Sequence, residues 1–144
     1  MIQLALYKGQ GDWFNALIRW WSRSRYSHCE LVINGTCYSS SIRDGGVRGK
    51  VMALPADKWD VIDLPWADEC AAQRWFNQHA HDRYGFADLL LCQLLGMRRD
   101  SRGVFCSEAC AAALGLPDPT RFSPGALGEL VRYVNINTVF LLRA

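Results

Sequence analysis

Two residues of this chain, Cys106 and His28, have the types and settings that covalent chemistry requires. Cys106 lies in Phe105-Cys106-Ser107-Glu108, at the expected N-terminus of a helix rich in small side chains. A cysteine there meets unpaired backbone N–H groups and the positive end of the helix dipole, which lower the pKa of a thiol and can bind an oxyanion. An imidazole within reach would accept the thiol proton. The pair predicts a thiol hydrolase or transferase.

His28 is expected on the first strand of a β-hairpin. Asn34 and Gly35 form the strongest two-residue turn signal, so residues 27–33 and 36–41 are predicted to be partner strands. In this register alternation places four polar side chains on one face of the sheet: His28, Glu30, Ser39 and Ser41. Such a face fits simple exposure to solvent, and it also fits a site in which Ser39, Glu30 or Ser41 orients the imidazole.

The helix that begins near Cys106 is predicted to pack closely on the sheet. It contains four alanines between Cys106 and Gly115. Small side chains let a helix axis approach a sheet, which would bring Cys106 within reach of His28. The alternative interpretation is that Cys106 is a small core residue. Packing is the expected role of four other cysteines: Cys29, Cys37, Cys92 and Cys110.

The remaining elements are predicted from periodicity and from the positions of glycine and proline. We expect further strands over residues 2–7, 47–51, 58–64 and 138–142, and helices over 13–21, 66–79, 86–95, 105–114 and a short stretch from 123. The helix over 13–21 is expected to be capped by Asp12. Two interpretations are open for its tryptophans, Trp13, Trp20 and Trp21: an aromatic wall for the substrate or the buried side of the helix, of which we favour burial. The pattern predicts an α+β fold with a mostly antiparallel sheet.

Composition and charge limit the partners and the location. The chain has 144 residues, half of them apolar, and a formal charge of +2, which predicts a single domain over residues 1–144 and no nucleic-acid partner. The opening residues lack the features of a signal peptide and no apolar run is long enough to span a membrane, so we expect a cytoplasmic location in the producing cell.

The six cysteines are expected to be free thiols. We expect no cofactor and no metal, and we interpret His79 and His81 as solvated. The oligomeric state is left open.

Three short motifs carry a resemblance to a known family. They are Tyr26-Ser27-His28-Cys29-Glu30-Leu31-Val32, Tyr84-Gly85-Phe86 and Phe105-Cys106-Ser107-Glu108. With the histidine before the cysteine, the chain from about residue 11 to residue 116 resembles the circularly permuted branch of the NlpC-type, papain-like hydrolases, which includes relatives of lecithin:retinol acyltransferase. The resemblance implies a permuted papain-like fold with an antiparallel sheet packed against the helix that carries the nucleophile, Cys106, and with His28 as base.

The resemblance also implies further site residues, with one departure. Tyr84 is expected to line the site, with a core tyrosine as the alternative interpretation, and Tyr26 and Ser107 are expected to contact substrate. The family often has His, Asn, Gln or Glu as the third polar residue on the strand after the histidine, and the corresponding residue here is Ser39, a weaker orienting group. Glu30, across from Ser39, would supply a carboxylate.

The resemblance implies acyl transfer, and three functions are carried forward. The leading expectation is hydrolysis of an amide bond in peptidoglycan peptides, which would require delivery by a phage particle, a secretion apparatus or cell lysis. A second is a lipid acyltransferase or thioesterase, so the substrate would be a peptide or an acyl compound. The third is a non-catalytic binding or virion-associated module on the same fold.

Overall fold

A seven-stranded sheet forms the centre of the computed structural model, which describes residues 1–85 and 103–141. Across the sheet the strands are β5 (Trp59–Asp63), β1 (Ile2–Tyr7), β2 (His28–Ile33), β3 (Thr36–Ser41), β4 (Gly46–Lys50), β6 (Arg83–Tyr84) and β7 (Gly103–Val104). All paired neighbours are antiparallel except β6 and β7. With its helices the molecule is α+β, as the sequence predicts.

The β2–β3 turn has the geometry that its sequence favours. Asn34 and Gly35 both have positive φ, 49° and 83°, as the two central residues of a type I′ turn require. The turn pairs Ile33 with Thr36, so the predicted hairpin and its register are confirmed. In the described hairpin the pairs end at Leu31 and Tyr38.

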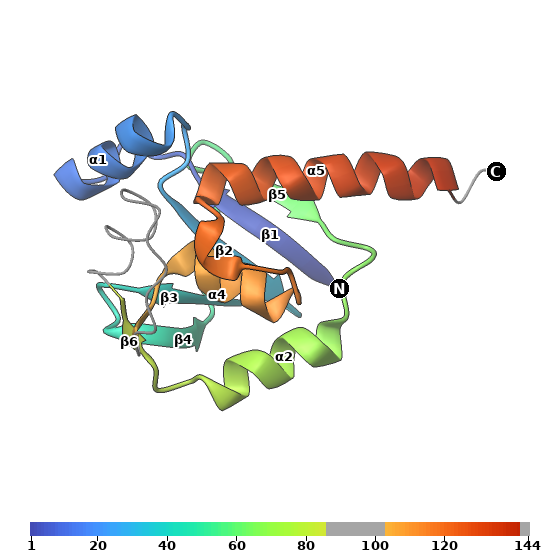
Figure 1. Ribbon diagram of the computed structural model, residues 1–144. Helices are drawn as coiled ribbons and strands as arrows, with labels where there is room; N and C mark the ends of the chain where they lie inside the picture. The colour runs from blue at the N-terminus through green and yellow to red at the C-terminus, as the bar shows by residue number, and fades with distance from the viewer. Residues whose placement is uncertain (86–102, 142–144) are drawn as a thin grey trace.

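Three helices cover one face of the sheet. The helix α4 (Cys106–Ala113) contacts β2 and β3, α2 (Glu69–Gln78) contacts α4, and α5 (Pro124–Leu141) contacts β1 (Figure 1). Between them lies the main core, which includes Leu4, Leu6, Cys29, Leu31, Ile33, Phe76, Ala109, Cys110, Leu127 and Val131. Burial of these side chains, at about 25 cal/mol per Å² of apolar surface, fixes α4 against the sheet.

A smaller cluster lies on the opposite face. It joins Ala5, Val32, Cys37 and Trp59, and the loop residues Met52 and Leu54 pack against it. Because side chains alternate along a strand, His28 and Glu30 share this face with Val32, whereas Cys29 and Leu31 face the helices.

The helix α1 (Trp13–Ser22) corrects one expectation. Asp12 caps it as predicted, accepting a hydrogen bond from the Asn15 N–H at 3.1 Å. However, no residue of α1 is buried, and Trp13 and Trp20 are each 75% exposed, so the predicted burial of its tryptophans is wrong. The helix lies at the rim of the sheet, where only its Phe14 and Ile18 side is partly covered.

The C-terminal segment is helical where the sequence predicts a strand. The predicted strand at 138–142 is wrong, because residues 138–141 continue α5. No glycine or proline follows Gly128 in this stretch, so nothing interrupts the helix, and burial of Leu127 and Val131 against the core outweighs the β-propensity of Thr138. The predicted helix over 86–95 lies outside the described residues. Among the described residues, none of the helices has the length and apolarity that crossing a membrane demands.

Candidate active site

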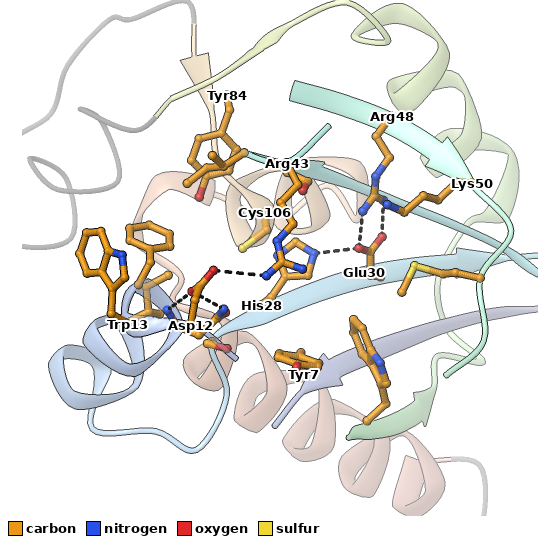
Figure 2. Close-up of a pocket in the computed structure, with 18 residues that line it drawn as sticks. Tyr7, Asp12, Trp13, His28, Glu30, Arg43, Arg48, Lys50, Tyr84 and Cys106 are labelled. Carbon is orange, nitrogen blue, oxygen red and sulfur yellow. Dashed lines mark hydrogen bonds and ion pairs between the residues drawn. The ribbon is translucent and has the colours of Figure 1, made fainter. Parts of the chain in front are cut away.

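Cys106 is the first residue of α4 and lies at the base of a cleft. The N-cap is the fully buried Phe105, whose side chain gives no hydrogen bond to the first turn, while Glu108 accepts from the Phe105 N–H at 3.2 Å. The N-cap side chain therefore does not compete with a ligand for the backbone N–H groups near Cys106. The Cys106 residue is 2% exposed, and its sulfur lies beside the ring of His28 (Figure 2).

His28 is the first residue of β2 and meets Cys106 at the end of the sheet. The His28 side chain lies on the face of the sheet opposite α4, so α4 does not lie over the imidazole. His28 and Cys106 meet because each is the first residue of its element. The His28 Nε2 lies 2.7 Å from Glu30 Oε1, which leaves Nδ1 as the ring nitrogen for the thiol. A ring so held by a carboxylate on one side can exchange a proton with sulfur on the other.

The charges of the two residues support each other. Burial would lower the pKa of His28, but the charge of Cys106 and hydrogen bonds to Cys106 and Glu30 raise this pKa to about 10. A hydrogen bond from the Cys29 thiol, opposed by burial, and the charge and hydrogen bond of His28 hold the pKa of Cys106 well below its ordinary value of 9.0. The directions of both shifts favour a thiolate–imidazolium pair over a neutral one.

Glu30 is a buried carboxylate that is held ionised. Its residue is 1% exposed, and the Arg48 guanidinium donates to both of its oxygens, at 2.5 and 2.6 Å. Burial alone would raise the pKa of Glu30, yet the hydrogen bonds and charges of Arg48 and His28 lower it. Arg48 is held in turn by Asp44, 2.7 Å from its Nε, and Lys50 also binds Asp44, at 2.8 Å. The imidazolium thus has a fixed negative partner.

Ser39 is placed between these groups without contacting His28. It pairs directly with Arg48 across β3 and β4, and Arg48 reaches past it to Glu30 on β2. The Ser39 hydroxyl donates to the backbone carbonyl of Cys29 at 2.7 Å. Glu30 therefore holds the position of the orienting group, and the small Ser39 leaves room for the Arg48 side chain.

The cleft above Cys106 has a volume of about 580 Å³, in the range of small-molecule sites. Its lining residues are Tyr7, Asp12, Trp13, Phe14, Asn15, Ile18, Ser27, His28, Glu30, Ser41, Ile42, Arg43, Arg48, Lys50, Met52, Trp59, Tyr84 and Cys106. Aromatic side chains line more than one side of the cleft, among them Trp13 and Tyr7, and charged side chains such as Arg43 lie among them (Figure 2). The lining can hold an acyl group of mixed polarity.

The remaining residues predicted for the site divide into two sets. Tyr84 lines the cleft, and burial together with the charges of Cys106 and Cys29 raises the pKa of its hydroxyl, which stays protonated. Tyr26 and Ser107 do not line the described cleft. The Tyr26 hydroxyl instead donates to Asp60 at 2.5 Å, and the Ser107 hydroxyl donates to the Phe122 carbonyl at 2.6 Å.

Two residues of the site were missed in the sequence. Arg48 could have been found by extending the hairpin reasoning through the turn at Gly45, because the register then puts Arg48 opposite Ser39. Cys29 was read as a packing residue, yet it also donates a hydrogen bond to the Cys106 sulfur. No sequence signal marks a thiol as such a donor.

Outside the site, His79 has local partners, whereas His81 is exposed. The His79 Nδ1 lies 2.8 Å from the Trp75 carbonyl oxygen, and the ring stacks on Trp75 with centroids 4.1 Å apart. Among the described residues, no three His, Cys, Asp or Glu side chains form a group that could bind a metal ion.

Comparisons of the chain with protein-family models, curated proteins and solved structures give no significant match.

Proposed function

We propose that the protein is a cysteine-dependent hydrolase that cleaves amide bonds through an acyl-enzyme on Cys106. The observation that carries the proposal is the Cys106–His28–Glu30 arrangement, with the imidazole held through Nε2 at 2.7 Å and its other side toward the sulfur. The order of these residues agrees with the permuted papain-like branch that the sequence motifs resemble. The fold proposed for the chain is accordingly the permuted papain-like one.

The first half of the reaction uses the thiolate and the imidazolium. The Cys106 sulfur attacks the substrate carbonyl carbon, and the carbonyl π electrons move onto oxygen, where first-turn N–H groups of α4 stabilise the oxyanion. As this intermediate collapses, the C–N bond breaks and the leaving nitrogen takes the proton from His28 Nδ1. A thioester on Cys106 and a free amine result.

The second half returns the enzyme to its starting state. The neutral His28 takes a proton from water, whose oxygen attacks the thioester carbonyl. The C–S bond then breaks, which releases a carboxylic acid and restores the thiolate. Glu30 stays ionised and stabilises the imidazolium each time it forms.

Peptidoglycan peptides are the substrate class that we propose. These peptides carry free carboxylates, and the cleft wall includes Arg43, with a side chain 77% exposed, and Lys50, 43% exposed. Both cations already have acidic partners, Asp12 and Asp44, so a substrate carboxylate would share or exchange them. The NlpC-type resemblance supports the same class.

The aromatic wall of the cleft favours a second candidate, acyl transfer with lipid substrates. Trp13, Phe14 and Ile18 line the cleft on the α1 side. On the other side lie Tyr7 and Trp59, whose rings are tilted to each other with centroids 5.1 Å apart. An acyl chain would bury against these side chains. Cys106 would then carry a fatty acyl thioester, and the acceptor would be water or another nucleophile.

Digestion of purified muropeptides, followed by mass spectrometry, tests the leading proposal. We expect the wild type and a Cys70→Ala control, which removes an exposed thiol of α2, to release the same new amine, and Cys106→Ala to release none. If muropeptides stay intact while an acyl ester acylates Cys106, the lipid candidate replaces the leading one. If iodoacetamide labels Cys106 no faster than Cys70 in the wild type, the domain is a non-catalytic binding module.

A further inference from the structure

The outer face of α1 is an apolar stripe that residues 1–85 and 103–141 leave uncovered. Trp13 and Trp20 are each 75% exposed, Leu17 is 40% exposed and Trp21 is 38% exposed. At about 3.6 residues per turn, these positions fall on one side of the helix. A surface helix of a globular protein normally turns such a face toward the core, whereas α1 turns the side of Phe14 and Ile18 inward and leaves its tryptophans outside.

Polar contacts, and not core packing, hold α1 in this orientation. The Arg19 guanidinium donates to the carbonyls of Gly9 and Gln10 at 2.6 and 2.7 Å. At the N-terminus, Asp12 caps the helix and forms an ion pair with Arg43 at 3.2 Å. These contacts tie the inner side of α1 to the body of the protein and leave the tryptophans outward.

The surroundings of the stripe are cationic. From residue 12 to residue 25 the chain contains three arginines and one aspartate. Arg23, the C-cap of α1, is exposed and forms no ion pair within the described part of the chain. Arg25, one of these three, and Arg43 have side chains 67% and 77% exposed, and each also forms an ion pair with an aspartate.

We propose that α1 is an interfacial helix that docks the protein on an anionic lipid bilayer. Indole rings prefer the boundary between headgroups and acyl chains, and arginines beside them bind anionic headgroups, which together make the pattern of a helix lying in the membrane surface. Trp13 belongs both to the stripe and to the cleft wall, so docking brings the mouth of the cleft to the bilayer. The inference goes beyond the proposed function, since no step of acyl transfer uses the outer face of α1.

A second copy of the chain is the competing occupant, and the size of the stripe argues against it. Trp13 and Trp20 together offer roughly 300–500 Å² of surface, by the area that an aromatic side chain buries. A stable dimer takes about 800 Å² from each partner. Repulsion between the arginines of two facing copies would weaken such a dimer further.

Cosedimentation with vesicles tests the proposal. The probes are vesicles of equal parts phosphatidylglycerol and phosphatidylcholine, and vesicles of phosphatidylcholine alone. The test variant is Leu17→Glu with Trp20→Glu, which leaves the cleft lining intact. The matched control is Tyr133→Glu with Ile136→Glu, which removes two apolar side chains of α5 that are 67% and 58% exposed.

We expect the wild type and the α5 control to bind the anionic vesicles, and the α1 variant to bind at least about tenfold more weakly. Binding should weaken with added salt and on neutral vesicles, because part of it is electrostatic. Equal alkylation rates of Cys106 in the wild type, the α1 variant and the α5 control would show that the site is intact in all three. A loss of vesicle binding would then count against the membrane proposal alone and not against the proposed hydrolase. The proposal is overturned if the wild type does not bind anionic vesicles, if both variants lose binding equally, or if light scattering shows a dimer that only the α1 variant loses.

Discussion

The Arg48 guanidinium binds both carboxylate oxygens of Glu30 from a strand that is not the neighbour of the Glu30 strand. Glu30 lies on β2 and Arg48 on β4, with β3 between them, and the two contacts measure 2.5 and 2.6 Å. Glu30 in turn contacts His28 at 2.7 Å. The orientation of the imidazole thus depends on a side chain that lies two strands away in the sheet and acts through Glu30.

Replacing Arg48 should cost stability in a pH-dependent way. Arg48→Met leaves the buried Glu30 carboxylate with His28 alone, and we expect the free energy of unfolding at neutral pH to fall by about 3–5 kcal/mol. Because the pKa of Glu30 is held below its ordinary 4.5, its contribution is full above that pH and is lost as the pH falls through the lower folded-state pKa. Urea unfolding at several pH values measures both effects.

The matched control for Arg48 is Arg74→Met, which removes an exposed arginine of α2. We expect its unfolding midpoint to change little, since exposed charges contribute at most about 1 kcal/mol. Equal midpoints for the two variants would contradict the role given to Arg48.

Glu30 and Ser39 can be distinguished as orienting groups. Glu30→Gln removes the negative charge beside the imidazole, so we expect the rate of acyl-enzyme formation to fall by about 10–100-fold. Ser39→Ala removes a hydrogen bond to the Cys29 carbonyl, and we expect a smaller fall. Single-turnover kinetics with an activated ester compare the two, and a larger loss for Ser39→Ala would restore the serine as the orienting group.

The pH profile of the wild type should be broad. The pKa of Cys106 lies below its ordinary 9.0, and that of His28 is about 10. The thiolate–imidazolium pair should therefore exist between these two pKa values, up to about pH 10. We expect the iodoacetamide labelling rate of Cys106 to level off well below pH 9, and amide cleavage to decline above about pH 10 as His28 loses its proton. In His28→Ala, labelling should rise only at higher pH. Identical labelling profiles for the two proteins would show that the residues do not interact.

Cys29 should act on Cys106 through its thiol. Burial and hydrogen bonds with Cys106 and Cys110 raise the pKa of Cys29 well above 9.0, so Cys29 keeps its proton and can donate to the Cys106 thiolate. We expect Cys29→Ala to move the labelling profile of Cys106 to higher pH. Cys37→Ala is the matched control, because Cys37 is equally buried but belongs to the cluster on the other face. A shift of the same size in both variants would assign the effect to loosened packing.

Local signals in the sequence were enough to predict the hairpin and the elements that carry the site. The turn residues Asn34 and Gly35 fix the β2–β3 register, and the alanines of α4 predict its close packing on the sheet. The choice between Glu30 and Ser39 could not be predicted, because it depends on Arg48 reaching across β3. That contact requires the pairing of three strands to be known.

The wrong predictions have a common physical origin. Burial of Trp13 and Trp20 was expected from residue type alone, and a strand at 138–142 from β-propensity alone. Both depend on what lies nearby in the folded protein. Tyr26 likewise lies within the site motif, but Asp60 and Arg132 hold its hydroxyl elsewhere, at 2.5 and 2.9 Å.

The positions of Cys106 and His28, each at the start of its own element, also govern when the thiol becomes reactive. The two residues lie far apart in the sequence, and in an unfolded or newly made chain Cys106 is an ordinary thiol, mostly protonated at neutral pH. The reactive thiolate arises only after β2 has joined the sheet and α4 has packed on it. A cell that makes this protein therefore does not carry the activated nucleophile during synthesis, and the rate at which Cys106 gains its reactivity after dilution from denaturant records the completion of folding.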